Sequence, residues 1–269
     1  MSYKVSLSGA RALITGGASG LGRQLAIQAA AKGTHIIIWD MNLANAKKVV
    51  DEIVSAGGSA EAHQVDITNR EAVNKLALKV GPVDVLFNNA GVVSGDWLLD
   101  LDPASIERTY NVNVLSLYWM TQAFLPAMVQ ANGGCVVTIS SASGLLGVAK
   151  LTDYAASKFA AFGFMESLRS ELRMKRSSVN TLTVCPHYIG TGMFDGVQTK
   201  FPWLLPILEE QKVAAKILAS VEKGRAQLVM PKFVNVIPVT RILPVRAFDK
   251  VTDFFGVNRT MDHFRGRHR

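Results

Sequence analysis

A tyrosine and a lysine four residues apart, Tyr154 and Lys158, have types and spacing suited to acid–base chemistry. On a helix, residues at i and i+4 share a face about 6 Å apart, and the run that follows Tyr154 favours a helix. A nearby ammonium favours the phenolate, but the pKa of a tyrosine must fall from about 10 to near 7 to act at neutral pH, which corresponds to roughly 4 kcal/mol. One lysine hardly supplies that, so we expect a second positive charge beside the phenol. Ser141, thirteen residues earlier, follows the apolar run 135–139 and could project from a strand end toward the same point.

The tyrosine–lysine pair alone is weak evidence, because a surface tyrosine beside a solvated lysine has the same spacing. The start of the chain adds a second motif. The apolar residues 10–14 run into a glycine-rich turn, residues 15–22, and then into a helical pattern. Backbone N–H groups and the helix dipole at such a turn bind a diphosphate, and the missing side chains let it approach. The glycine spacing is G-x-x-x-G-x-G, which a plain strand-to-helix turn could also show.

Asp40 ends the next predicted strand, eighteen residues beyond Gly22. An acidic side chain there can accept hydrogen bonds from the 2′-hydroxyl of an adenine-linked ribose and would repel a 2′-phosphate. No Arg or Lys lies inside the glycine turn, so NAD is favoured over NADP, and Arg23 just past the turn is the argument for NADP. The oxidised nicotinamide of such a cofactor would be the second positive charge near Tyr154. Asp40 could instead cap the helix of residues 42–56.

Small and polar residues follow the later strands as well. Asp66 follows the strand of residues 60–65. It could contact an adenine ring or cap the helix of residues 69–79, and the sequence favours neither alternative. The segments 88–91 and 185–191 follow two further strands, as expected at a cofactor crevice. The predicted helix 104–131 contains Asn111 and Asn113. Helix interiors disfavour asparagine, so one of the two has a buried role, and composition does not choose between them.

The alternation of strands and helices predicts an α/β fold, a Rossmann-type doubly wound parallel sheet of about seven strands with helices on both faces. At 269 residues and 49% apolar, the chain can bury a large core. We predict a single catalytic domain over residues 1–231. Within it, residues 192–208 are apolar and interrupted by prolines, and we interpret them as a substrate lid, with a packed connection as the alternative. Residues 232–269 form a basic, partly amphipathic extension.

Charge and cysteine content limit the function further. Of the net charge of +8, residues 224–269 carry +6. The predicted helix 245–255 is weakly amphipathic and could lie on anionic lipid, or it could pack onto the body of the protein. The basic residues are not accompanied by a motif that would contact bases in a DNA or RNA groove, so we predict no nucleic-acid partner. The two cysteines have no metal-ligand spacing, and no metal is predicted. Without a visible secretory signal or spanning run, the expected location is cytoplasmic, with peripheral membrane contact as an option.

Taken together, these motifs resemble the short-chain dehydrogenase/reductase family over about residues 8–231. The resemblance implies that Tyr154 is the catalytic acid/base, that Ser141 orients the substrate oxygen and that Lys158 binds the nicotinamide ribose and lowers the tyrosine pKa. It also implies that Asn113, rather than Asn111, supports a proton-relay water. His187 stands where the family usually has glycine. That segment resembles the branch that includes retinol dehydrogenases and enzymes of lipid-like or steroid alcohols.

The resemblance and the apolar residues near the motifs predict a hydride transfer between NAD(H) and a small hydrophobic alcohol or ketone, by a homodimer or homotetramer. The alternative is a non-catalytic nucleotide-binding scaffold or sensor on the same fold. Such a protein would be expected to have lost part of the Ser, Tyr and Lys set, and in this chain the set is complete. The predicted cofactor contacts are Gly16, Ser19, Gly20, Leu21, Gly22, Asp40, Asp66, Ile67, Asn89, Ala90, Gly91, Tyr154, Lys158, Pro186, Ile189 and Thr191. The predicted substrate contacts are Ser141, Ser143, Leu146, Tyr154, His187, Met193 and Trp203.

Overall fold

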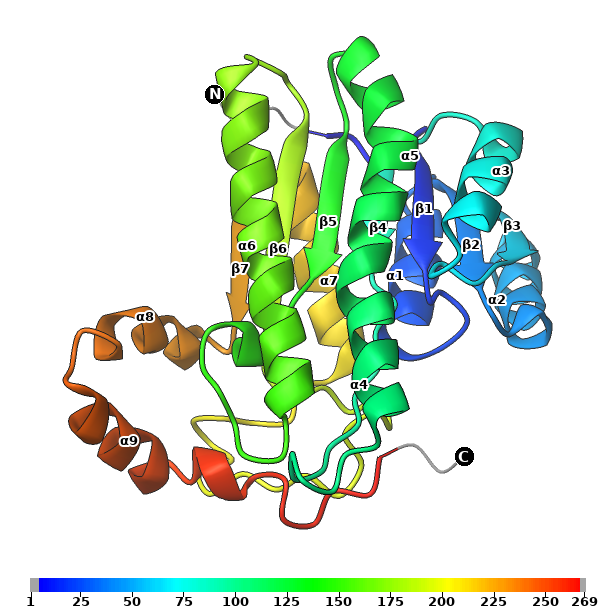
Figure 1. The fold of residues 1–269 in the computed structure, drawn as a ribbon. Coiled ribbons are helices and arrows are strands. Elements are labelled where there is room, and N and C mark those ends of the chain that lie inside the picture. Colours follow the sequence, from blue (N-terminus) through cyan, green and yellow to red (C-terminus); the bar gives the residue numbers. More distant parts are fainter. Residues whose placement is uncertain (1–4, 267–269) are drawn as a thin grey trace.

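The computed structural model describes residues 5–266, and its centre is a parallel sheet of seven strands (Figure 1). The strands lie in the order β3-β2-β1-β4-β5-β6-β7. Because the chain moves outward from β1 and then returns to the other side of it, the strand order reverses between β1 and β4. Such a reversal leaves a crevice at the carboxyl ends of the strands, and the predicted doubly wound sheet is confirmed. The strands are β1 (Arg11–Thr15), β2 (His35–Asp40), β3 (Ser59–Gln64), β4 (Val85–Asn88), β5 (Cys135–Ile139), β6 (Asn180–Pro186) and β7 (Gln227–Met230).

Helices cover both faces of the sheet, because successive side chains of each buried strand point to opposite sides. Ile36 and Ile38 face a core shared with α1, α2 and α7, whereas Ile37 and Trp39 face a core shared with α3, α5 and α6. Figure 1 shows α5 and α6 in front of the sheet and α1 and α7 behind it. The helices are α1 (Gly20–Ala30), α2 (Leu43–Ser55), α3 (Arg70–Val80), α4 (Pro103–Tyr110), α5 (Ser116–Gln130), α6 (Thr152–Met174) and α7 (Glu210–Glu222).

The helix predicted over residues 104–131 is present but not uniform. Between α4 and α5 the chain forms one π-helical turn, η1 (Asn111–Leu115), and such turns are frequent at functional sites. The turn directs Asn113 inward while Asn111 stays exposed. By length and composition alone, Pro103–Gln130 could cross a membrane. In this fold it packs Met120 and Phe124 against the sheet, as a core helix does.

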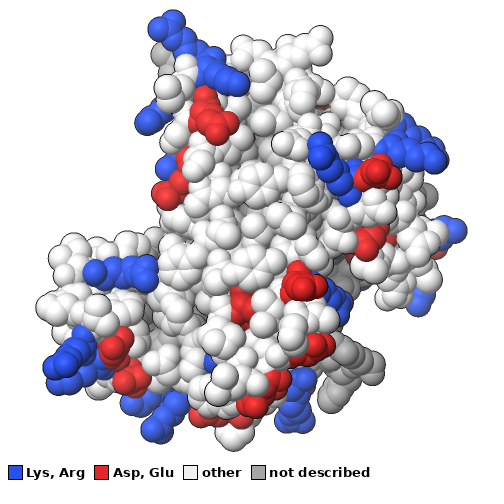
Figure 2. Space-filling model, viewed as in Figure 1, with Lys and Arg blue, Asp and Glu red and all other residues white. Residues whose placement is uncertain are grey.

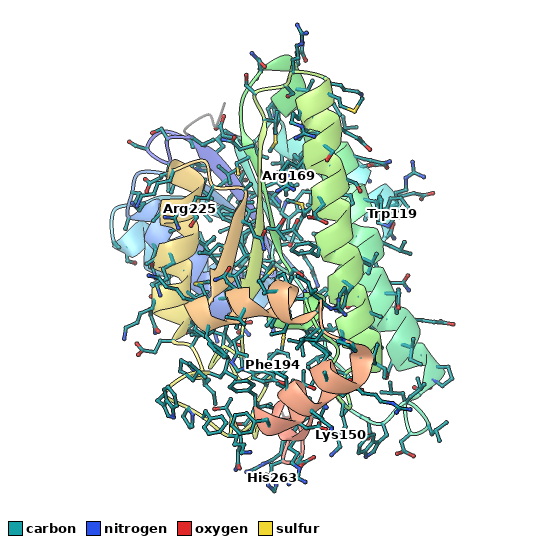
Figure 3. The ribbon with its side chains drawn as sticks, turned by 90° about the vertical axis from the view of Figure 1, so that its left-hand side faces the viewer. Trp119, Lys150, Arg169, Phe194, Arg225 and His263 are labelled. Carbon is teal, nitrogen blue, oxygen red and sulfur yellow. The ribbon has the colours of Figure 1, made fainter. Side chains whose placement is uncertain are left out.

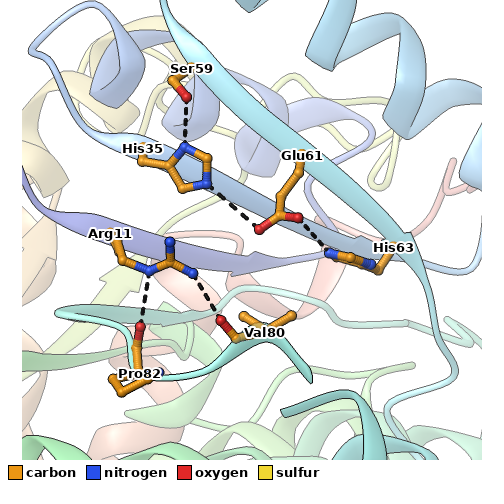
Figure 4. A network of polar contacts seen from close by, with 7 residues as sticks. All are labelled: Arg11, His35, Ser59, Glu61, His63, Val80 and Pro82. Atoms are coloured by element: carbon orange, nitrogen blue, oxygen red, sulfur yellow. Dashed lines mark hydrogen bonds and ion pairs between the residues drawn. The ribbon is translucent and has the colours of Figure 1, made fainter. Parts of the chain in front are cut away.

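The outer edge of the sheet is covered by polar side chains. On β3, Glu61 bridges His35 Nε2 at 3.6 Å and His63 Nε2 at 3.1 Å, and His35 Nδ1 lies 2.7 Å from Ser59 Oγ (Figure 4). Charged side chains on an edge strand oppose pairing with another chain. Nearby, Arg11 donates to the carbonyl of Val80 at 2.9 Å, at the end of α3. The Glu61 contact with His35 joins the edge strand to β2, and the Arg11 contact joins β1 to the end of α3.

Beyond β7 the chain turns under the sheet and forms the extension. It contains η3 (Lys232–Val236), α8 (Ile237–Thr240), α9 (Val245–Phe254) and η4 (Val257–Arg259). In Figure 1, α8 and α9 form an arm at the lower left, and the chain then runs back beneath the molecule. There it pairs with residues 192–208: the amide of Gln198 donates to the carbonyl of Thr260 and that of Arg265 to Asp195. The predicted helix near residues 245–255 is confirmed, and its neighbour is the body of the protein.

Candidate active site

The glycine turn between β1 and α1 has the shape of a diphosphate cradle. A Cβ added to Gly22 would lie 2.2 Å from the carbonyl oxygen of Gly16, so no larger residue fits there. Gly16 and Gly20 have positive φ values of 66° and 51°, which other residues rarely adopt. The turn runs directly into the N-terminus of α1, where backbone N–H groups and the helix dipole attract phosphate. These residues fit a dinucleotide.

The segment after β4 holds this turn in place. Asn89 Nδ2 donates to the carbonyls of Thr15 at 2.9 Å and Gly16 at 3.2 Å. The Thr15 hydroxyl in turn accepts from the backbone amides of Asn89 and Ala90. The predicted cofactor residue Asn89 therefore shapes the cradle through its side chain.

Asp40 lies beside the cradle, at the end of β2. Its Oδ2 accepts from the amide of Ala18 at 3.0 Å and its Oδ1 from the amide of Asn42 at 2.9 Å. The carboxylate is therefore fixed beside the glycine turn at the end of β2. Arg23 turns away to an ion pair with Glu52 at 2.6 Å. Arg23, just past the turn, is thus already engaged by a carboxylate.

Ser141, Tyr154 and Lys158 meet at the carboxyl ends of β5 and β6. Ser141 follows β5, and the other two come from adjacent turns at the start of α6. Lys158 Nζ lies 5.6 Å from the centroid of the Tyr154 ring and donates to the carbonyl of Ile139 at 2.8 Å. All three side chains are buried. The structure brings together the residues that the i,i+4 spacing and the strand end predicted.

Burial controls the ionisation of these groups. It raises the pKa of Tyr154 above its usual value, and the hydrogen bond with Ser141 opposes the rise. Burial also lowers the pKa of Lys158 to about 8. The protein alone therefore keeps the phenol protonated, which agrees with the expectation that one lysine does not lower the tyrosine pKa enough.

Asn113 lies beside this group. Its Oδ1 accepts from the amide of Val92 at 2.9 Å, and its Nδ2 donates to the carbonyl of Val92 at 2.9 Å and to Ser157 Oγ at 3.0 Å. A Cβ added to Gly91 would lie 3.3 Å from Asn113 Oδ1 and 3.5 Å from Lys158 Nζ. The buried role expected for one of the two helix asparagines thus belongs to Asn113.

A cavity of about 700 Å³ joins the cradle to the Ser141–Tyr154–Lys158 group. Its volume lies within the range of small-molecule sites. Nearly all the predicted contacts line it, including Ser143, Leu146, His187 and Met193. Gly20 and Asn113 are not among the residues that line it. The prediction for Trp203 differs from the structure: its side chain is 80% exposed and lies outside the cavity wall, because the turn that carries it points toward solvent.

The extension supplies wall residues that the sequence analysis assigned to lipid or to packing. One face of α9 lines the cavity with side chains spaced i, i+3, i+4 and i+7. These residues are Phe248, Val251, Thr252 and Phe255. In Figure 3, Phe194 lies in the space between the end of the sheet and α9. Its ring packs edge-on against Tyr154 at 5.6 Å and Tyr188 at 5.0 Å. The amphipathic pattern of residues 245–255 indicated an apolar helix face, but the sequence could not show which surface this face contacts.

His187 replaces the usual glycine and takes part in the wall. Its Nδ1 lies 3.3 Å from the carbonyl of Pro206, which can only accept, so Nδ1 carries the hydrogen. Burial lowers the His187 pKa to about 4, so the ring is neutral near pH 7. Among residues 5–266, no group of three or more His, Cys, Asp and Glu side chains could hold a metal ion.

The glycine cradle, joined by one cavity to the buried phenol–hydroxyl–ammonium group, fits a nucleotide-dependent oxidoreductase. The family model for short chain dehydrogenases matches residues 10–201. The chain is 41% identical over 270 residues to epidermal retinol dehydrogenase 2 of Mus musculus, covering 97% of this chain and 87% of that protein. It is 33% identical over 248 residues to 17-beta-hydroxysteroid dehydrogenase 13 of Homo sapiens, covering 90% and 82%.

Among solved structures, a metagenomic short-chain oxidoreductase in complex with NADP is similar, with a TM-score of 0.71 and 30% identity over 84% of this chain and 97% of the other. The chain therefore belongs to the short-chain dehydrogenase/reductase family, and the predicted resemblance to its retinol dehydrogenase-like branch is confirmed. A nicotinamide dinucleotide is its class of cofactor.

Proposed function

We propose that the protein uses NAD(H) to interconvert a hydrophobic alcohol and its carbonyl. The observation that carries the proposal is the buried Ser141, Tyr154 and Lys158 group where the glycine cradle opens into an apolar chamber. When bound, the dinucleotide supplies the hydride acceptor or donor. Ser141 donates a hydrogen bond to the substrate oxygen, Tyr154 takes or returns the hydroxyl proton, and Lys158 stabilises the phenolate.

The direct test replaces Tyr154 with phenylalanine, which removes the proton-transferring oxygen and keeps the ring that packs on Phe194. Turnover should fall by about 10²–10⁴-fold. Binding of NADH, followed by its fluorescence, should be unchanged. Turnover retained in Tyr154→Phe would refute the mechanism and favour the alternative of a nucleotide-binding scaffold.

NAD is the preferred cofactor in this proposal. Asp40 is fixed at the ribose position, and Arg23, which could pair with a 2′-phosphate, is held by Glu52. Replacing Asp40 with serine should lower kcat/KM for NAD about tenfold, because the carboxylate no longer accepts hydrogen bonds from the ribose hydroxyl. It should raise kcat/KM for NADP, because the repulsion of the 2′-phosphate is removed. A variant with an unchanged ratio of the two values would contradict the assignment. The matched control is Asp51→Ser, on the exposed side of α2.

The substrate class follows from the chamber walls. Leu146, Met193, Phe194 and the α9 face are apolar, and the relatives named above act on a retinol and a hydroxysteroid by their names. We propose a retinoid, steroid, long-chain or aromatic alcohol. A panel of these alcohols, run with both cofactors, should show activity that rises with apolar size, and preference for a sugar alcohol would contradict the proposal.

Residues 192–208 are proposed as a lid over this chamber, and residues 232–266 as its support. The lid has no long helix or strand and contributes Met193, Phe194 and Leu205 to the wall. Lys200 ties it to the extension by donating to the carbonyl of Phe254 at 2.9 Å. Substrate-dependent protection of residues 192–208 from hydrogen exchange is expected, and equal exchange with and without substrate would argue for a static connection.

The outer side of the arm fits a membrane surface. The apolar side chains Val239, Ile242, Val245 and Phe254 are exposed on the arm. The basic residues Arg246 and Lys250 are exposed on α9 as well, together with the acidic Asp249 and Asp253. Figure 2 shows basic, acidic and uncharged side chains mixed on this surface at the lower left. Apolar side chains with neighbouring cations bind anionic lipid, and a hydrophobic substrate would enter from the bilayer. We therefore propose a cytoplasmic, membrane-peripheral protein.

Co-sedimentation with phosphatidylcholine vesicles, with and without phosphatidylserine, tests this surface. Replacing Ile242 and Val245 with serine should reduce pelleting, whereas Leu78→Ser on α3, an equally exposed leucine, should not. Equal pelleting of both variants would contradict the membrane proposal.

We also propose a homodimer or homotetramer, supported by half-exposed Leu115, Tyr118 and Val129 along η1 and α5. Light scattering would test this oligomeric state.

A further inference from the structure

Asp153, directly before Tyr154, is a buried carboxylate that the mechanism above does not use. Only 4% of its surface is exposed. Its Oδ2 accepts hydrogen bonds from Ser94 Oγ and from Thr109 Oγ1, the latter at 2.8 Å. Its Oδ1 is buried without a hydrogen-bond partner in the described part of the chain. Asp153 does not line the cavity, so it does not meet substrate or cofactor.

Asp153 anchors the start of α6 to neighbouring segments through its side chain. Leu151, at the N-cap position, forms no side-chain cap. Asp153 lies in the first turn, where a carboxylate is favoured by the helix dipole. Instead of bonding to its own helix, it accepts hydroxyl hydrogens from two other segments.

Those two segments carry the other parts of the site. Ser94 follows Gly91 by three residues, and Thr109 precedes Asn113 by four, on α4. The hydrogen bonds of Asn113 to Val92 and Ser157 join the same three segments farther along α6. The Asp153 contacts and the Asn113 contacts therefore form two clamps around the junction where Tyr154 lies.

Stability alone does not account for a carboxylate at this position. A buried charge is costly unless all its acceptor sites are paired, and an apolar replacement of similar size is often as stable or more stable. Here one oxygen is unpaired, and the Thr109 hydroxyl, which has one hydrogen, also lies 2.9 Å from the carbonyl of Ser105. Such a group contributes more to a fixed geometry than to the free energy of folding.

Assuming the proposed function, we propose that Asp153 is a positioning residue: it fixes the first turn of α6 against the loop of Gly91 and against α4, and so sets where the Tyr154 oxygen lies relative to the nicotinamide end of the cradle. A misplacement of about 1 Å can cost about 100-fold in rate. The clamp needs an acceptor of the right shape rather than a negative charge.

The test compares Asp153→Asn with Asp153→Ala. Asparagine keeps the shape and an acceptor for the hydroxyls, whereas alanine removes both. With alanine, kcat should fall about 100-fold while the affinity for NADH stays within about twofold. The limb of the kcat–pH profile that reports Tyr154 should also move to higher pH, because the phenol lies farther from Lys158. With asparagine, kcat should stay within about fivefold of the wild type and the limb should not move.

Leu172→Ala is the stability control, since it removes a buried side chain at the other end of the same helix. It should lower the Tm without changing kcat per folded molecule. Ser94→Ala and Thr109→Val should each lower kcat, and neither should lower it further in the Asp153→Ala background, because the partners share one interaction. Equal losses of kcat in Asp153→Asn and Asp153→Ala would overturn the proposal. Losses of kcat in Asp153→Ala and in Leu172→Ala that both scale with the fall in Tm would also overturn it.

Hydrogen exchange provides a readout that is independent of turnover. Asp153→Ala should speed exchange in residues 151–158 and 91–94, and Leu172→Ala should not. Absence of turnover in the wild-type protein would refute the proposed function. The hydrogen-exchange rates would still show whether Asp153 holds these segments together. Unchanged exchange in both segments would refute the clamp.

Discussion

The two halves of the crevice are built in different ways. On the cofactor side, backbone dominates: Gly16 and Gly22 approach each other so closely that a Cβ does not fit, and Asn89 bonds to main-chain carbonyls. On the substrate side, side chains dominate: Phe194, which packs edge-on against Tyr154, and the apolar face of α9 line the same cavity. The first half comes from neighbouring strands, and the second joins segments from residues 192–208 with residues 232–266.

This difference indicates how each half can change. A backbone cradle tolerates almost no substitution, because its shape depends on atoms that every residue shares. A wall of side chains can be altered one residue at a time, with effects limited to the substrate. Lys158 belongs to both halves, since its ammonium lies between Gly91 and the Tyr154 ring.

The largest effect on cofactor binding is expected from Gly22→Ala, which breaks the cradle. The new methyl would meet the carbonyl oxygen of Gly16, and overpacking of this kind costs about 1–3 kcal/mol or more. We expect the affinity for NADH to fall about 100-fold, as measured by fluorescence titration. Gly163→Ala in α6, where a Cβ meets nothing within 4 Å, is the control and should bind as the wild type does. Equal affinity of the two variants would show that the turn is not the diphosphate site.

Lys158→Met tests the residue that serves both halves. The folded-state pKa of about 8 lies below the ordinary 10.5, so folding with a charged Lys158 is penalised, fully below pH 8 and less as the pH rises toward 10.5. At pH 7 the variant should be about 1–2 kcal/mol more stable than the wild type, after the lost hydrogen bond to Ile139 is allowed for, yet inactive. Urea unfolding at pH 7 and pH 10 measures this, and the gain should shrink at pH 10. A variant that is less stable at pH 7 would contradict the buried charge.

Part of the difference between the two halves of the crevice could be predicted from the sequence. The i,i+4 spacing of Tyr154 and Lys158, the glycine turn and Asp40 are local patterns, so sequence alone placed them. The clamp of Ser94, Thr109 and Asp153 left no such pattern, because its members are 59 and 44 residues apart from the carboxylate and meet only in three dimensions. For the same reason, the sequence did not show that Trp203 is largely exposed and outside the cavity lining, and its predicted contact with substrate stays a prediction.

Phe248→Ala tests whether the extension belongs to the substrate half. Removing a large apolar side chain from the wall should raise the KM of a retinoid or steroid alcohol about tenfold, since about 1.4 kcal/mol of contact is lost. The KM for NAD should not change. Phe254→Ala, whose ring is exposed on the same helix, is the control. A KM unchanged by Phe248→Ala would mean that α9 only packs against the lid.

The smallest effect is expected from Trp203→Ala. Its ring is largely exposed and lies outside the cavity wall, so kcat and KM should stay within about twofold of the wild type. Steady-state kinetics with the best substrate of the panel measures both constants. A large rise in KM would mean that the lid moves to bring Trp203 onto the substrate.

The most direct test of the account follows the transferred hydrogen. An alcohol labelled with deuterium at its carbinol carbon is incubated with NAD and the wild-type enzyme or Tyr154→Phe, and the nicotinamide is analysed by mass spectrometry. The account predicts label in the NADH formed by the wild type and almost none with Tyr154→Phe, although both proteins bind NADH. Equal labelling by the two proteins, or none by the wild type with any alcohol of the panel, would contradict it.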